Sequence, residues 1–223
     1  MSYMIDCQYI QLSKNGFELD NLFEFMYFPA LKINSKKGEM LFYVQELVLM
    51  EIDKKDTELF HFVYDTGLHS LDRLNNLKLN YHLKYIRNNF GVDTSFTSDR
   101  IQKQVSFKLD FINLVDKLKI QTLYFKGGIF LEHLIKLQYP NIELVNLSLS
   151  PYNLKPASQL FQSSTICSDI SCTIHNIDKR GCSIWKILKY YLGVIYLSKI
   201  KDNNWISNVR LNYISRNCFY QIY

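Results

Sequence analysis

The sequence predicts an α/β fold in which a mixed sheet is flanked by helices. Antiparallel, aromatic-rich strand patterns come first along the 223-residue chain, and strands alternate with helices afterwards. Hydrophobic residues make up 48% of the chain and charged residues 21%, which is ordinary for a globular protein and excludes wholesale disorder. Because we find no internal repeat and no clear boundary, we expect a single domain over residues 1–199 and an aromatic C-terminal extension over 200–223.

Apolar runs bounded by polar breaks predict the strands. The expected strands cover, in order, residues 3–10, 41–53, 58–65, 120–125 and 142–149. The second and third are separated by the short polar turn Lys54-Lys55-Asp56, which is typical of an antiparallel hairpin. Residues 17–28 alternate poorly, and a strand extension and a short helix both stay open there.

Apolar residues at near-helical spacing predict the helices. The expected helices cover, in order, residues 68–89, a segment from Ser98 or Asp99 to 118, then 129–137, 157–162 and 183–200. Ser98 or Asp99 would cap the second helix, because a side-chain oxygen at that position accepts a bond from the first free N–H groups.

Charge and cysteine content restrict the class of protein. The chain has 26 Lys and Arg against 21 Asp and Glu, a formal charge of +5, and no long basic run that would indicate a polybasic tail. No signal peptide is visible, and no stretch approaches the roughly 20 apolar residues of a membrane span. We therefore expect a reduced, intracellular protein with no membrane partner and no disulfide framework.

The first candidate site is Asp6 with Gln8 on the opening strand. Residues two apart on a strand point to the same face, so these side chains should project together. A carboxylate pair in this arrangement holds divalent metals, because hard cations bind several anionic oxygens. Here the second position is an amide, and the alternative is a lone strand aspartate near a sheet edge.

The second candidate site is the turn at Lys126, Gly127 and Gly128, between an expected strand and an expected helix. Backbone N–H groups at the helix start attract anions, and the charge of Lys126 makes it the candidate nucleic-acid contact. Glu132, about one turn into the helix, would reach the carboxyl end of the sheet. The alternative is a structural turn, since the segment matches neither a P-loop nor a dinucleotide fingerprint.

The third candidate site is a Cys/His cluster with the spacing C-x4-C-x2-H-x6-C. Its members are Cys167, Cys172, His175 and Cys182. Thiolate and imidazole ligands suit zinc, and four of them in one short loop would form a closed, structural site. Because the spacing is not that of a standard finger, buried free cysteines with a loop histidine stay open as the alternative.

Taken together, these features resemble the ribonuclease-H-like fold of DEDD-type 3′–5′ exonucleases. The resemblance rests on the strand with Asp6, the hairpin at 41–65, the strand–Lys-Gly–helix at 120–137 and the helix at 183–200. More closely, the series LYFKGGIFLEHLI, IELVNL, C-x2-H and a late Cys-Ser-Ile resembles a group of proteins found in insect mobile elements and large insect DNA viruses. The resemblance covers residues 1–199.

The resemblance implies four carboxylates around two metals, and this chain departs from that pattern. Asp6 matches the first acid, Gln8 stands in place of the second, and Glu132 would take the third position. The region of the last acid, Cys182 to Lys189, contains none, although Asp169 or Asp178 would substitute if their loop folded back. Two missing carboxylates should abolish two-metal binding, because the divalent charge is no longer compensated.

We therefore expect a degenerate, catalytically inactive viral or mobile-element protein that binds nucleic acid or a host protein. It would act in the cytoplasm or nucleus of the host cell. The alternative is an active exonuclease that uses Mg²⁺ or Mn²⁺ with rearranged carboxylate ligands.

Overall fold

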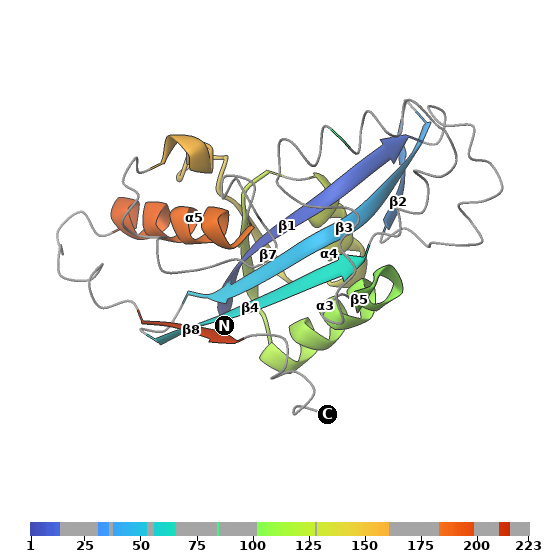
Figure 1. The fold of residues 1–223 in the computed structure, drawn as a ribbon. Helices are drawn as coiled ribbons and strands as arrows, with labels where there is room; N and C mark the ends of the chain where they lie inside the picture. The colour runs from blue at the N-terminus through green and yellow to red at the C-terminus, as the bar shows by residue number, and fades with distance from the viewer. Residues whose placement is uncertain are drawn as a thin grey trace.

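The computed structural model of the chain describes residues 1–13, 31–35, 38–52, 56–65, 84, 102–127, 129–160, 183–198 and 210–214. These residues form one mixed sheet with helices on its two faces (Figure 1), so the predicted α/β class is confirmed. Among the described residues, no helix is both long enough and apolar enough to cross a membrane.

Antiparallel strands form the first half of the sheet. β1 (Ser2–Ser13) pairs with β3 (Gly38–Glu51), and β3 pairs with β4 (Asp56–Asp65), both antiparallel. β2 (Leu31–Ser35) pairs with the first residues of β3. The predicted hairpin at 41–65 is thereby confirmed, because two β-rich runs joined by a short polar turn pair with each other most readily.

Parallel strands extend the sheet on the other side of β1. β6 (Thr122–Phe125) pairs with β1 and β7 (Glu143–Asn146) pairs with β6, with α4 (Ile129–Gln138) between them in the chain. The order across the sheet is therefore β4-β3-β1-β6-β7. Antiparallel strands come first and strand–helix alternation follows, as the sequence pattern predicts.

Two further strands pair in parallel with the outer edge of β4. They are β5 (Gln102–Lys103) and β8 (Arg210–Ile214). β8 belongs to the segment expected as an aromatic extension, so part of that extension joins the sheet of the main domain. β5 also corrects the predicted start of the second helix: α3 (Gln104–Leu118) begins at Gln104, because the two preceding residues pair with β4.

The sheet separates two hydrophobic cores. One is formed by Tyr3, Ile5 and Cys7 of β1 with residues of α3 and α4, among them Phe111, Leu114, Leu131 and Ile135. The other is formed by Met4, Val48 and Leu59 with residues of α5 (Ser183–Ser198), among them Ile184, Ile187 and Tyr191. Each fully buried side chain of this size contributes roughly 1.5–3 kcal/mol, so these contacts fix α5 on one face and α4 on the other.

One expected helix is shorter in the structure, and other expected segments lie outside the described residues. The predicted helix at 157–162 is a 3-10 turn, η3 (Ala157–Gln159), after which Leu160 is already extended. The segments expected at 17–28 and, except for Lys84, at 68–89 lie outside the described residues. The four residues of the Cys/His cluster lie outside them as well.

Candidate functional site

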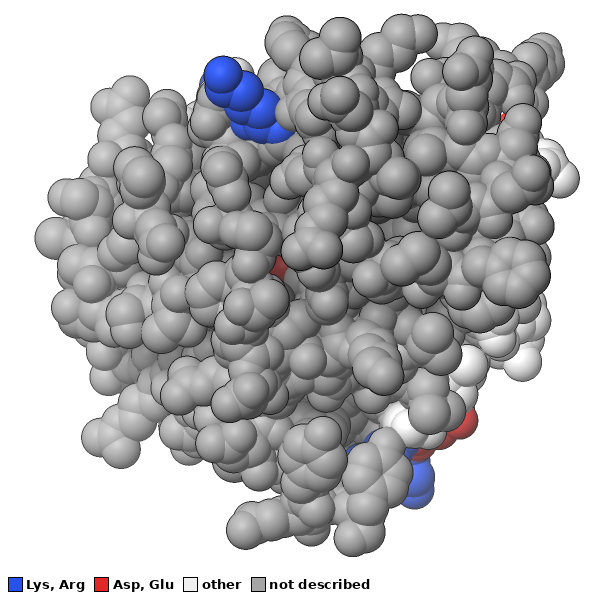
Figure 2. Space-filling view, turned by 45° about the vertical axis from the view of Figure 1, so that its right-hand side comes forward, with Lys and Arg blue, Asp and Glu red and all other residues white. Residues whose placement is uncertain are grey.

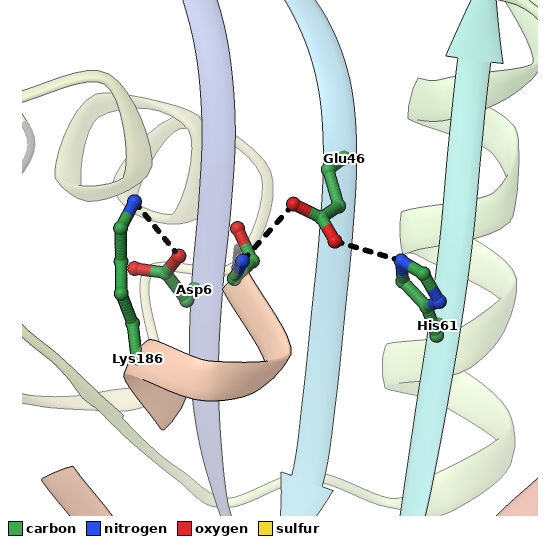
Figure 3. A network of polar contacts seen from close by, with 5 residues as sticks. Asp6, Glu46, His61 and Lys186 are labelled. Carbon is green, nitrogen blue, oxygen red and sulfur yellow. Dashed lines mark hydrogen bonds and ion pairs between the residues drawn. The ribbon is translucent and has the colours of Figure 1, made fainter. Parts of the chain in front are cut away.

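A buried group of polar side chains lies between the sheet and the first turns of α5 (Figure 3). We call it the α5 polar cluster, and it comprises Asp6, Gln8, Glu46, His61, Ser183 and Lys186. Ser183 is 0% exposed, Glu46 1% and Asp6 8%, although they carry polar or charged groups. Polar groups at this depth are costly unless they are paired, so their contacts show what the cluster can do.

Strand geometry places the cluster members from the sheet on one face. Asp6 and Gln8 alternate with Ile5 and Cys7, which belong to the core on the opposite face. The two polar side chains therefore share the α5 face, as the strand period predicts.

A β-bulge brings Glu46 to the same face. Gln8 pairs with Glu46 whereas Tyr9 pairs with Val44, so Gln45 is an extra residue on β3. The extra residue shifts the alternation of β3 by one, and Val44 and Leu47 therefore face the same core although they are an odd number of residues apart. Glu46 directly precedes Leu47 on the strand, so its side chain points to the opposite face, which is the face of α5.

The carboxylate of Glu46 joins the sheet to the start of α5. Its Oε1 lies 2.8 Å from Nε2 of His61, and its Oε2 accepts a hydrogen bond from the backbone N–H of Ser183 at 3.0 Å. The first turn of α5 contains no acidic residue of its own. Glu46 therefore supplies from the sheet the negative charge that a helix N-terminus favours. A charged carboxylate that accepts from His61 places the imidazole proton on Nε2.

Asp6 has a different partner. Its Oδ2 lies 3.6 Å from Nζ of Lys186, which is on α5 three residues after Ser183 and so on the same side of the helix. The same oxygen is buried and has no hydrogen-bond donor among the described residues. The ammonium of Lys186 is thus the positive charge that faces this carboxylate (Figure 3).

The surrounding groups respond to the charge of the cluster. Burial raises the pKa of the Cys7 thiol well above its usual range, and the charges of Asp6 and Glu46 add to this while Lys186 opposes it. Burial, followed by the charge of Asp6, raises the pKa of Tyr190 to about 12. Burial is the larger cause for both groups, and the charge of Asp6 adds to it in each.

The cluster does not fit a two-metal centre. Within the part of the chain that the structure describes, no three His, Cys, Asp or Glu side chains are grouped so that they could hold a metal ion. Gln8 offers a neutral oxygen, Glu46 is bound by two donors, and Asp6 faces an ammonium. Two divalent cations would bring far more positive charge than these groups compensate.

Glu132 is not brought to Asp6. It lies on α4, whose buried residues Leu131 and Ile135 pack in the core on the opposite face of the sheet from Asp6. Its side chain is 40% exposed and forms an ion pair with Lys136 one turn later. Pairs of this kind stabilise an exposed helix by a few tenths of a kcal/mol, which gives Glu132 a local role.

The amine of Lys126 is held by two acceptors in the chain after β7. Its Nζ donates to Oγ of Ser148 at 3.2 Å and to the backbone carbonyl of Leu154 at 2.5 Å, and burial lowers its pKa. Gly127 has a φ of +67°, a value that glycine adopts without strain, so the turn after β6 depends on it. The turn predicted here is present, and Lys126 joins it to the chain after β7.

Glu46 and His61 are the functional candidates that the sequence does not single out. His61 reads as one alternating residue of a strand, and Glu46 as one polar residue in a run of apolar ones. The sequence does offer one signal for Glu46, which is its charge within the apolar run FYVQELVLM. A glutamate in a buried strand is almost always paired, so this residue predicts a buried partner.

The positive charge of the chain does not gather into one described patch on the face in Figure 2. The described Lys and Arg side chains visible there lie at two separate places.

Comparison with protein-family models, with curated proteins and with solved structures finds no match for this chain. The geometry of the cluster therefore carries the functional argument.

Proposed function

We propose that this chain is a catalytically inactive viral or mobile-element protein with a ribonuclease-H-like fold, which binds nucleic acid or a host protein. It would do so in the cytoplasm or nucleus of a host cell. One observation carries the loss of catalysis: Nζ of Lys186 lies 3.6 Å from the only carboxylate that β1 contributes to the α5 polar cluster.

The topology supports the fold part of this proposal. β1, β3 and β4 are antiparallel neighbours, and β6 and β7 continue the sheet in parallel from the other side of β1. Asp6 lies on the central β1, where the resemblance to DEDD-type exonucleases implies the first acid. α5 then covers the face to which Asp6 points.

The charges support the functional part. A two-metal nuclease needs several carboxylates around its cations, because each divalent ion requires anionic oxygens. At the α5 polar cluster two carboxylates face one ammonium, an imidazole and a backbone N–H. These partners occupy carboxylate oxygens that a divalent cation would otherwise need.

A nuclease assay tests the proposal directly. Purified wild-type chain is incubated with single-stranded and duplex DNA and RNA in Mg²⁺, Mn²⁺ or EDTA, next to Asp6→Ala and Glu132→Ala prepared identically. We expect only a background that all three proteins share. Metal-dependent cleavage that is lost in Asp6→Ala would overturn the proposal, since a contaminating nuclease is unaffected by that substitution.

A salt titration tests the binding function. Contacts to phosphates release counterions, so the logarithm of the affinity for nucleic acid should fall linearly with the logarithm of the salt concentration. Fluorescence anisotropy with labelled single-stranded and duplex oligonucleotides measures this slope. Absence of salt-dependent binding would exclude nucleic acid and leave a protein as the partner.

A second candidate function is an active metal-dependent exonuclease with rearranged ligands. The position of Glu46 favours it, because this carboxylate pairs in register with Gln8 and lies on the same face as Asp6. In the same nuclease assay, this candidate requires that Glu46→Ala abolish cleavage whereas Glu132→Ala retain it.

A further inference from the structure

The sheet is covered at one edge and open at another. The outer edge of β4 pairs with β5 and β8, whereas β7 pairs only with β6 among the described residues. The N–H groups of Glu143 and Leu147 donate toward β6. Because the direction of the main-chain groups alternates along a strand, the N–H groups of Leu144 and Asn146 point away from the sheet. Within the described part of the chain, β7 therefore presents an edge that a further strand can join.

The edge of β7 is apolar and lacks the usual protection. The strand reads ELVN, with neither lysine nor proline, which are the residues that commonly protect a sheet edge. Leu144 and Val145 are half-buried. Beyond the strand, the N–H of Leu149 donates to the carbonyl of Asn146, and the side chain of Leu149 is 61% exposed. Main-chain groups that await a partner thus lie beside apolar side chains that a partner would cover.

Opposite charges mark the two ends of this edge. Glu143 is exposed at the first residue of β7. Lys126 lies at the other end, where its Nζ donates to Oγ of Ser148, two residues after the strand. Both charges are on the same face, since Glu143 accepts from Oγ1 of Thr122, and Thr122 and Lys126 are an even number of residues apart. A strand with the same charges that runs antiparallel to β7 would set each negative end against a positive end.

We propose that β7 is a dimerisation edge, and that its occupant is β7 of a second copy of this chain in antiparallel orientation. A two-fold axis at Val145 aligns Leu144 of each copy with Asn146 of the other. Each aligned pair exchanges two main-chain hydrogen bonds, and the two copies of Val145 face each other where side chains are closest. The carbonyl of Asn146 takes part with its second lone pair, because Leu149 occupies only one.

The charges select this orientation. The two-fold axis places Glu143 opposite Leu147 of the second copy, at the end that carries Lys126. It keeps the two copies of Glu143 about 13 Å apart along the strands, which exceeds the Debye length at physiological salt. A parallel arrangement would set Glu143 against Glu143 and Lys126 against Lys126. This inference goes beyond the proposed function and does not depend on it.

Sedimentation velocity of the full chain tests the inference. Because a short strand edge buries less area than a stable dimer needs, the dimer should be weak, and the measurement covers about 5–500 µM chain. Val145→Lys sets two ammonium groups opposite each other, and should raise the dissociation constant about five- to tenfold. The matched control is Asn34→Lys, which adds the same charge at an exposed residue of β2 and should change the constant by less than about twofold.

A mixture of two variants tests the position of the axis. Val145→Glu should also dimerise poorly alone, whereas an equimolar mixture with Val145→Lys should form a heterodimer, because the two-fold axis sets the opposite charges against each other. A dimer that Val145→Lys does not weaken, or that Asn34→Lys weakens equally, overturns the inference. Folded variants that do not recover association in the mixture overturn it as well.

The wild type and a cysteine variant keep the test independent of how the charged variants fold. A wild-type chain that stays monomeric over the whole concentration range overturns the inference, and leaves a strand of another protein as the occupant of β7. Val145→Cys is close in size to the native residue, and mild oxidation should link two copies through this position. Asn34→Cys carries the same native cysteines and should not be linked beyond the wild-type level. Equal linkage in the two cysteine variants overturns the inference.

Discussion

Replacement of Glu46 by leucine should destabilise the chain strongly, although the two side chains are similar in size. The carboxylate is 1% exposed and accepts from His61 and from the N–H of Ser183. In Glu46→Leu both of these groups stay buried without their acceptor. A hydrogen bond to a charged group contributes about 1.5–3 kcal/mol, and removal of one partner from a buried pair costs about 3–5 kcal/mol.

We therefore expect Glu46→Leu to lower the free energy of unfolding by about 3–5 kcal/mol, a large part of the 5–15 kcal/mol typical of a whole domain. Urea unfolding followed by circular dichroism measures this loss as a lower midpoint at an unchanged slope. The double variant Glu46→Leu with His61→Leu should regain part of it, because an apolar pair leaves one fewer unsatisfied group. Recovery should be incomplete, since the N–H of Ser183 still lacks its acceptor.

The control is Glu132→Gln, which removes a carboxylate from an exposed helical pair with Lys136. Its cost should stay below about 0.5 kcal/mol. If Glu46→Leu costs less than about 1 kcal/mol, or no more than Glu132→Gln, Glu46 does not join the sheet to α5 as argued.

Five further results are expected. Cys7 should react slowly with iodoacetamide in the folded chain, as peptide mass spectrometry would show, because it is 8% exposed and its pKa is raised by burial. The thiol ionises at a lower pH in the unfolded chain than in the folded chain, so the free energy of unfolding should fall as the pH rises above 9.0. For this one group the fall is at most about 1.4 kcal/mol per pH unit. Cys7→Ala should reduce the fall, and identical pH profiles for the wild type and Cys7→Ala would contradict this. Lys126→Met should cost about 1–3 kcal/mol in urea unfolding, because the carbonyl of Leu154 loses its donor, and a neutral effect would show that the amine is free to bind anions. Gly193→Val should lower the free energy of unfolding by about 1–3 kcal/mol, since a Cβ added at Gly193 would lie 3.0 Å from the side chain of Leu154. An unchanged melting temperature would exclude this close approach. Elemental analysis of the purified chain should find near-stoichiometric zinc that is lost when cysteines of the predicted cluster are replaced by serine, whereas zinc-free protein would remove the prediction. The residues of that cluster are Cys167, Cys172, His175 and Cys182.

Local patterns in the sequence predicted most of the described fold. The hairpin of β3 and β4, the strand β6 and the helix α4 all lie within a few residues of their expected bounds. The start of α3 was wrong by several residues, because the potential caps Ser98 and Asp99 lie before residues that pair with β4. A cap signal is local, whereas strand pairing depends on a partner far away in the chain.

The candidate site was predicted less completely. The strand period placed Asp6 and Gln8 together correctly, but the resemblance favoured Glu132, an acid on the helix after a central strand, as the third acid. The structure does not bring Glu132 to Asp6, because α4 packs against the face of the sheet opposite to the one that carries Asp6. The buried partners that the structure does show, Glu46 and His61, gave no motif because they lie on different strands.

The sequence by itself determined the elements of this protein, because apolar periodicity and turn residues act over a few neighbouring positions. It also determined that Asp6 has no second acid two residues later. Only the tertiary structure decided which charges meet. The bulge at Gln45 moved Glu46 to the α5 face, and the docking of α5 brought Ser183 to a carboxylate 137 residues away. The same docking set Lys186 beside Asp6, because register and helix placement depend on the packing of two whole cores rather than on any local pattern.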